Sequence, residues 1–166
     1  MRETFVPQDF EVPQRKEFGN YFVEPITTDM VDEDLKTLLA NADMIVQLRG
    51  GSGSKDEWPY VCTREEDLKD LAWLEVCAGY KQLFSYVLRN NDDNSYAGCI
   101  YIYPIELFYP ELADTYDVDF SFWITKKEYS RETYSDIYKS LLEWLGNEWP
   151  FDRERIYQRN KERPQL

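Results

Sequence analysis

The fold is decided by the stretch Tyr116-Asp117-Val118-Asp119-Phe120-Ser121-Phe122-Trp123-Ile124-Thr125. Apolar and mostly polar side chains alternate along it, which is typical of a β-strand with one buried face and one acidic face. The buried face holds Val118, Phe120, Phe122 and Ile124, and the other face holds Asp117, Asp119, Ser121 and Trp123. We therefore expect a half-buried strand at the centre of the domain.

A helix is predicted to follow this strand. From Tyr134 the apolar residues recur at helical spacing, and the pattern predicts an end near Gly146 and Pro150. The loop between strand and helix, residues 126–133, carries Lys126, Lys127 and Arg131 and leads to a helix N-terminus, where unpaired N–H groups favour an anion. If the protein has an active site, it is expected at this junction.

The length and the net charge of the chain limit its domain organisation and its partners. A chain of 166 residues is most simply one domain, residues 1–166, with an extended N-terminal arm over 1–19 and a basic tail over 159–166. The net charge of −13 argues against nucleic acid or an anionic membrane as a partner, because the mean field repels phosphate. The same field would attract a cationic substrate.

The residue types present exclude much of enzyme chemistry. There is no His, so a Ser-His-Asp triad, a Cys-His pair and a His general base are all excluded. Cys62, Cys77 and Cys99 form no CxxC pair and are interpreted as reduced core thiols, and no metal site is expected. The N-terminus has no apolar signal region and no run reaches the length of a membrane span, so a cytoplasmic protein is expected.

The remaining elements are read in chain order. Residues 21–26 predict a first strand, and residues 29–45 predict one helix or a close pair that breaks near Asn41. Thr63-Arg64-Glu65-Glu66 is a capping box that opens a helix to about Lys81. Two β-rich runs, 83–90 and 96–104, flank strong turn residues and predict an antiparallel hairpin, and 154–158 is a brief last strand.

Glu75 is the carboxylate that this pattern singles out. On a helical projection it falls within the apolar stripe of the helix that starts at Thr63. A buried carboxylate must be hydrogen-bonded, paired or protonated. One interpretation is a structural carboxylate bonded to a Tyr or Trp, and the other is a general base or an amine-binding group facing a cleft.

The glycine-rich run Gly50-Gly51-Ser52-Gly53-Ser54 has two interpretations. A phosphate-binding loop needs a preceding strand and a following Gly-Lys-Ser/Thr, and both are missing. A flexible surface loop, which could still close over a ligand, is favoured.

The expected order of elements is strand, helix pair, three-stranded antiparallel meander, helix and strand. This order resembles the GNAT superfamily of acyl-CoA-dependent N-acetyltransferases. Several blocks are similar to a group of small bacterial GNAT-like proteins: Asp70-Leu71-Ala72-Trp73-Leu74-Glu75, Gly98-Cys99-Ile100-Tyr101-Ile102-Tyr103-Pro104, Phe122-Trp123-Ile124, Trp144-Leu145 and Trp149-Pro150-Phe151. The resemblance implies an α/β (α+β) fold with a mixed, mostly antiparallel central sheet flanked by helices, lacking the usual C-terminal helix and strands.

The resemblance also implies an activity and a site. In GNAT enzymes the pantetheine arm of acetyl-CoA bonds to the backbone of the strand that corresponds to residues 116–125, and the loop after it binds the pyrophosphate. The implied cofactor-binding residues are Phe122, Trp123, Ile124, Thr125, Lys126, Lys127, Ser130 and Arg131. The implied reaction is acetyl transfer to a small, cationic primary amine. Glu75 is expected as the base, then Asp119 or Asp117, with Tyr101 and Tyr103 lining the substrate pocket.

An alternative comes from departures from the family pattern. The family's loop, Gln/Arg-x-x-Gly-x-Gly/Ala, contains glycines that wrap the pyrophosphate, whereas residues 126–133 contain none. The tyrosine that often protonates the leaving thiolate has no counterpart, and Tyr157 is a candidate only by rough position. The chain would then be a catalytically inactive binding or interaction module, with a possible homodimer through the edge of the last strand.

Overall fold

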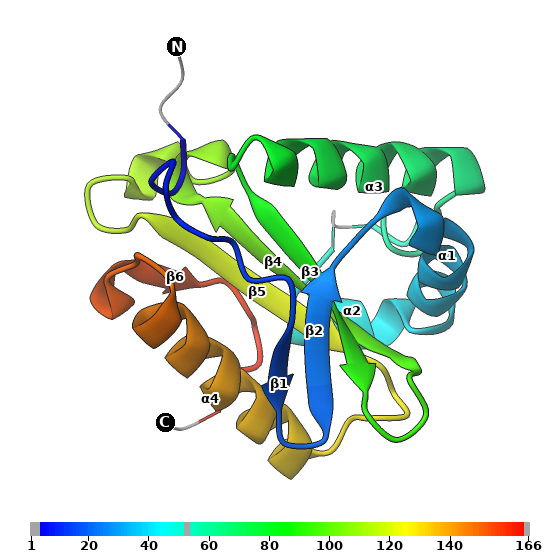
Figure 1. The fold of residues 1–166 in the computed structure, drawn as a ribbon. Coiled ribbons are helices and arrows are strands. Elements are labelled where there is room, and N and C mark those ends of the chain that lie inside the picture. Colours follow the sequence, from blue (N-terminus) through cyan, green and yellow to red (C-terminus); the bar gives the residue numbers. More distant parts are fainter. Residues whose placement is uncertain (1–3, 52–53, 165–166) are drawn as a thin grey trace.

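The computed structural model describes residues 4–51 and 54–164, which form one six-stranded sheet with helices on both faces (Figure 1). The strands are β1 (Lys16–Phe18), β2 (Tyr21–Pro25), β3 (Phe84–Asn90), β4 (Tyr96–Pro104), β5 (Val118–Ile124) and β6 (Ile156–Gln158). The helices are α1 (Val31–Ala40), α2 (Ala42–Leu48), α3 (Arg64–Gly79) and α4 (Arg131–Glu148). The predicted mixed sheet flanked by helices is confirmed.

The strands lie side by side in the order of the sequence, β1 to β6. Every neighbouring pair is antiparallel except β5 and β6, which are parallel. That parallel pairing is short, from Val118 opposite Ile156 to Phe120 opposite Gln158. The second half of β5 therefore extends beyond the end of β6 and needs another hydrogen-bonding partner.

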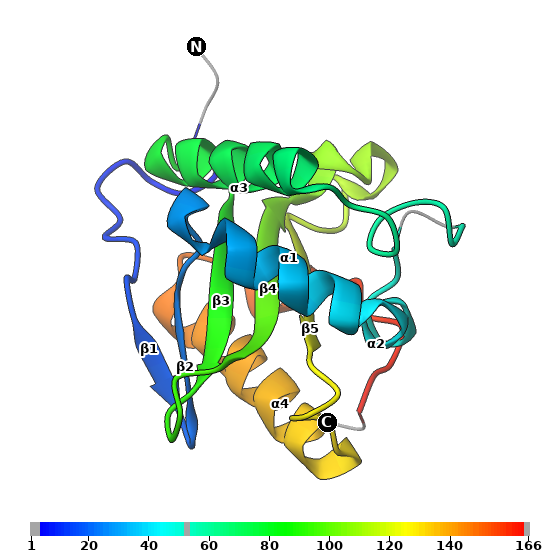
Figure 2. The ribbon, with the colours of Figure 1, turned by 90° about the vertical axis from the view of Figure 1, so that its right-hand side faces the viewer.

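The sheet is covered on both faces, by α4 on one and by α1, α2 and α3 on the other (Figures 1 and 2). The predicted alternation in β5 sets this arrangement. Phe120 and Phe122 pack on Tyr134 and Tyr138 of α4. The expectation of a half-buried strand is wrong, because every residue of β5 is buried, including Asp119 on its acidic face.

Local signals account for most of the element boundaries. The capping box is present, since Thr63 accepts from the Glu66 N–H and Glu66 bonds back to the Thr63 N–H. The helix pair breaks at Asn41 as predicted. Two expectations are corrected: α4 runs through Gly146 to Glu148, and the N-terminal arm contains β1, which pairs with β2.

Gly98 shows why one glycine belongs inside β4. A Cβ atom at this position would lie 2.1 Å from the carbonyl oxygen of Trp123, far inside a normal contact. The close approach of β5 to β4 therefore requires a residue without a side chain.

Three smaller expectations concern cysteines, metals and membranes. Cys62, Cys77 and Cys99 are free thiols. Within residues 4–51 and 54–164 there is no cluster of His, Cys, Asp and Glu that could hold a metal ion. No helix in that part of the chain is long and apolar enough to cross a membrane.

Candidate functional site

A pocket of about 370 Å³ lies between β4 and the helices that cover this face of the sheet. Its floor consists of alternate residues of β4, Cys99, Tyr101 and Tyr103, which share one face of the strand. Apolar and aromatic side chains form the walls: Leu38, Trp58, Leu71, Trp73, Leu74 and Phe108. A concave, aromatic site with a few polar groups is typical of a small-molecule pocket.

Two buried carboxyl groups, Asp34 of α1 and Asp67 of α3, line this pocket. They are hydrogen-bonded to each other, which requires a proton between them. Among the described residues Asp67 Oδ2 has no hydrogen-bond donor, whereas Asp34 Oδ1 accepts a bond from the Tyr96 hydroxyl. Burial, reinforced by the bond to Asp34 and its charge, raises the pKa of Asp67 to about 8. Burial also raises the pKa of Asp34, so the two carboxyl groups hold at least one proton between them at neutral pH.

Groups of both signs complete the lining. Asp70 lies at the exposed side of α3, and burial together with the charge of Asp34 raises the pKa of its carboxyl group. Arg49 donates from Nε to Ser121 Oγ at 2.8 Å, and its guanidinium carbon lies 4.2 Å from the centre of the Tyr101 ring. These contacts fix the orientation of Arg49, so the pocket presents fixed charges of both signs.

The predicted substrate-binding residues Tyr101 and Tyr103 both lie on the pocket floor. Burial raises the pKa of each phenol, so both remain protonated. Trp123 Nε1 donates to the Tyr101 hydroxyl at 3.0 Å. Burial likewise raises the pKa of Cys99 to about 12, so its thiol is not a nucleophile at neutral pH.

The predicted position of Glu75 in an apolar stripe is wrong. Glu75 is exposed, and its carboxylate accepts the backbone N–H of Thr28 at 3.1 Å, at the start of the 3₁₀ turn Thr28–Met30. The buried face of α3 instead holds Asp67, Leu71 and Leu74. Val76, the next residue along the helix, is also exposed, at 57%.

The other two predicted bases are held in ion pairs. Asp119 is fully buried and pairs with both Nε and Nη2 of Arg159. Burial raises the pKa of Asp119, and the ion pair opposes that shift. Asp117 is exposed and accepts two bonds from Arg155, at 2.7 and 2.9 Å. Neither carboxylate lines the pocket.

The predicted cofactor residues on β5 lie on an edge that the chain itself covers. Beyond the end of β6, the Phe122 N–H donates to Asn160 Oδ1 and the Phe122 carbonyl accepts from Asn160 Nδ2, both at 3.0 Å. Trp123, Ile124 and Thr125 are buried, and the Thr125 N–H bonds to the carbonyl of Ala97 in β4. In this arrangement both backbone groups of Phe122, one of the residues that the resemblance assigns to the cofactor, are occupied.

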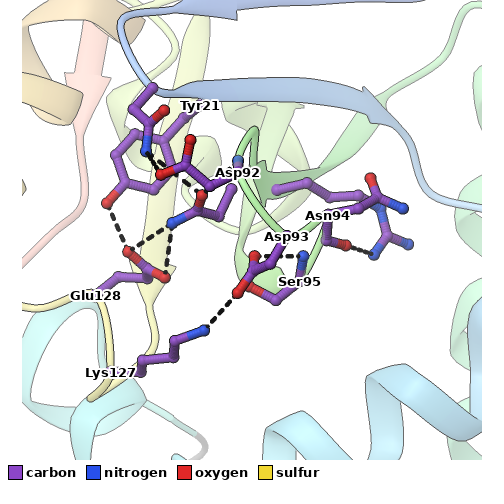
Figure 3. A network of polar contacts seen from close by, with 10 residues as sticks. Tyr21, Asp92, Asp93, Asn94, Ser95, Lys127 and Glu128 are labelled. Atoms are coloured by element: carbon purple, nitrogen blue, oxygen red, sulfur yellow. Dashed lines mark hydrogen bonds and ion pairs between the residues drawn. The ribbon is translucent and has the colours of Figure 1, made fainter.

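The predicted pyrophosphate loop is tied to the turn between β3 and β4, as Figure 3 shows. Lys127 pairs with Asp93 at 2.8 Å, and Glu128 accepts the Tyr21 hydroxyl at 2.6 Å. Ser130 is the N-cap of α4 and accepts the Thr133 N–H, while Lys126 and Arg131 are exposed. Of the three basic residues predicted to bind phosphate, Lys126 and Arg131 therefore face solvent, and Lys127 is held in an ion pair.

The predicted basic tail is part of the fold as far as residue 164. Arg159 is paired with buried Asp119, and Asn160 is 1% exposed. Glu162 accepts the Tyr129 hydroxyl. The segment Arg159–Arg163 therefore fills the space beside β5 and α4.

Sequence reasoning missed Asp34, Asp67 and Asn160. A signal for the first two was present, because Asp67 lies four and seven residues before Leu71 and Leu74, on the same helical face, and Asp34 lies four residues before Leu38. Asn160 follows a three-residue strand and has no periodic neighbours, so no local signal identifies it.

Solved structures with the same fold are GNAT acetyltransferases. The ribosomal-protein-S5-alanine acetyltransferase from Vibrio fischeri has 13% identity and a TM-score of 0.59, covering 80% of this chain and 67% of its own. The RimL ribosomal L7/L12 α-N-protein acetyltransferase, solved in complex with coenzyme A, has 14% identity, a TM-score of 0.59 and the same coverage. FdhC, a nucleotide-linked sugar GNAT, has 12% identity and a TM-score of 0.56, covering 84% of this chain and 70% of its own.

These likenesses place the chain among proteins with the GNAT fold, and the predicted resemblance is confirmed at that level. The chain spans about two thirds of the length of the first two structures. No protein-family model and no curated protein matches the sequence.

Proposed function

We propose that this protein is an acyl-CoA-dependent N-acetyltransferase that acts on a small cationic amine. The fold is that of GNAT acetyltransferases, one of which was solved with coenzyme A. The observation that carries the proposal is the pair of carboxyl groups, Asp34 and Asp67, in an aromatic pocket whose floor is formed by β4.

The carboxyl side of the pocket suits a small cation on electrostatic grounds. Arg49 and Arg159 also line the pocket, but Arg49 is held by Ser121 and Tyr101 and Arg159 is paired with Asp119. A carboxylate that ionises within this buried pair strongly favours a cationic partner. The rings of Trp58 and Trp73 line the same space, and aromatic faces attract ammonium groups. The net charge of −13 adds a long-range attraction for cations.

Proton transfer is the step that the pair can perform. An ammonium group must lose a proton before its nitrogen can attack a carbonyl carbon, and acetyl-CoA, when bound, supplies that acetyl group. Asp67, with a pKa of about 8, is matched to accept a proton near neutral pH. The fraction of Asp67 in the basic form rises with pH, so the rate is expected to rise up to about pH 8.

The test compares two variants of α3 that each replace a carboxyl group by an amide. Asp67→Asn keeps the shape of the side chain and removes the titrating group, whereas Glu65→Gln changes an exposed carboxylate on the same helix. With acetyl-CoA and a panel of short diamines and amino acid amides, we expect Asp67→Asn to lose at least about 100-fold in kcat and the rising pH limb. An unchanged kcat and pH profile in Asp67→Asn would refute the assignment.

A second candidate is a binding module with the GNAT fold and no transferase activity. Asn160 favours it, because its side chain occupies both backbone groups of Phe122. The pocket would then bind the amine without a second substrate. Calorimetric titration with the same amines, together with the absence of acetyl-CoA binding, would identify this case.

A further inference from the structure

Asn160 completes the hydrogen bonding of β5 where β6 has ended. A side-chain amide carries one carbonyl oxygen and an NH₂ group, so it offers the acceptor and donor of a peptide group. Asn160 uses both on Phe122, with N–O distances of 3.0 Å for each bond, and it also donates to the Tyr134 hydroxyl at 2.8 Å. One side chain thus substitutes for a strand neighbour.

The residues after Asn160 bridge α2 and the loop 126–133. We call the space that they fill at the edge of β5, between these two walls, the groove. The Lys161 N–H bonds to the carbonyl of Leu48, the last residue of α2, at 2.8 Å. On the other wall, Tyr129 donates its hydroxyl to the carboxylate of Glu162 at 2.9 and 2.8 Å. Figure 2 shows this segment in red beside α2.

The segment presents the chemical groups that an acyl-CoA would present, in the same order. An amide lies against the backbone of β5, and a carboxylate lies against the loop 126–133, which the resemblance assigns to the pyrophosphate. We propose that Asn160–Arg163 is an intramolecular occupant of the acyl-CoA groove and that acyl-CoA binds by displacing Asn160 and Glu162, while Arg159 stays paired with Asp119. This inference rests on the proposed function and concerns the control of the same site.

The contacts of the segment are of a kind that a ligand can replace. Lys161, Glu162 and Arg163 are polar and partly or fully exposed, and none anchors the segment in the apolar core. Asn160 is buried, but its bonds go to groups that a ligand amide would satisfy equally. A ligand amide can therefore take over the two bonds of Asn160 to Phe122, whereas the bonds of the segment to Leu48 and to the Tyr134 hydroxyl are lost. Because acyl-CoA binds only when the groove is open, its apparent affinity is the intrinsic affinity multiplied by the fraction of molecules with an open groove.

The test uses three variants of the segment in the full chain. Asn160→Ala removes the amide, Glu162→Ala removes the carboxylate, and Lys161→Ala is the matched control because its exposed side chain does not touch β5. Isothermal titration with acetyl-CoA gives the dissociation constant. We expect Asn160→Ala to bind about tenfold more tightly than the wild type or better, Glu162→Ala to gain less, and Lys161→Ala to stay within about twofold.

Hydrogen exchange gives a second readout that does not depend on turnover. In the wild type, saturating acetyl-CoA is expected to accelerate exchange at the Lys161 amide, which loses its bond to Leu48, while the Phe122 amide stays protected. If Asn160→Ala does not fold, Glu162→Ala and this measurement still decide the question.

The outcomes separate the two proposals. Equal affinity of the wild type and both folded variants, with the Lys161 amide still protected when acetyl-CoA is bound, would overturn the displacement inference and leave the acetyltransferase proposal intact. Absence of saturable binding in every protein at millimolar acetyl-CoA would overturn both, in favour of the binding module.

Discussion

Replacing Asp67 by Asn is expected to stabilise this protein, and to do so increasingly as the pH rises. The folded state holds a proton on Asp67 up to a pKa of about 8, whereas in the unfolded chain the pKa is 3.8. Between these values the unfolded state binds fewer protons than the folded state, so the free energy of unfolding falls as pH rises. The contribution of the Asp67 carboxyl group to the free energy of unfolding is fully present below about pH 4 and is lost by about pH 8.

The size of the effect follows from the single proton involved. Each pH unit inside the window costs about 1.4 kcal/mol, so raising the pH from 5.5 to 7.5 costs the wild type about 2.7 kcal/mol through Asp67. The amide of the variant can donate to Asp34 as the protonated carboxyl group does, and it does not titrate. The variant is therefore expected to gain about 2.7 kcal/mol on the wild type over this interval, or about 5–10 °C in Tm.

Urea unfolding at pH 5.5, 6.5 and 7.5, followed by tryptophan fluorescence, measures this difference directly. Glu65→Gln is the control, because an exposed carboxylate on the same helix should leave the pH slope of the wild type unchanged. A constant difference between Asp67→Asn and the wild type across the three pH values would refute the claim that Asp67 is protonated in the folded protein. A variant that is less stable at every pH would contradict the expected stabilisation and would show that the amide does not replace the protonated carboxyl group without loss.

Two further predictions concern β5. Asp119→Ala leaves Arg159 unpaired at a side-chain exposure of 16% and should cost about 3–5 kcal/mol in urea unfolding, whereas Asp117→Ala breaks an exposed pair and should cost less than about 1 kcal/mol. Equal costs would show that burial does not control these pairs. Gly98→Ala should cost at least about 1–3 kcal/mol, because its Cβ would lie 2.1 Å from the Trp123 carbonyl oxygen. A thermal midpoint within 1 °C of the wild type would contradict the close approach of β4 and β5.

The sequence predicted most of the fold because its signals there are local. The alternation in β5, the capping box at Thr63 and the turn residues between β3 and β4 each depend on neighbours within a few positions. These patterns specify elements and their order, and the order was enough to indicate the GNAT fold.

The site was harder to predict because it depends on which face of each element is covered. The apolar residues of α3 form more than one stripe, and only the sheet determines that Asp67 is buried and Glu75 is exposed. The pairing of Asp67 with Asp34 joins two helices, and the bond of Asn160 to Phe122 joins residues 38 positions apart. Neither of these long-range contacts can be recognised from a single sequence.

Tyr134 links the closure of the groove to the docking of a whole helix. Its ring stacks on Phe122 at 5.3 Å between centroids, while its hydroxyl accepts from Asn160 and donates to the Glu162 carbonyl. When the segment leaves, this hydroxyl loses both partners beneath α4, so the first turns of α4 and the segment should open as one cooperative unit. The amides of Tyr134–Tyr138 would then exchange with the same opening free energy as the Lys161 amide. The meander β3–β5 would be the more stable part of the molecule, and the first turns of α4 with the segment would be the less stable part.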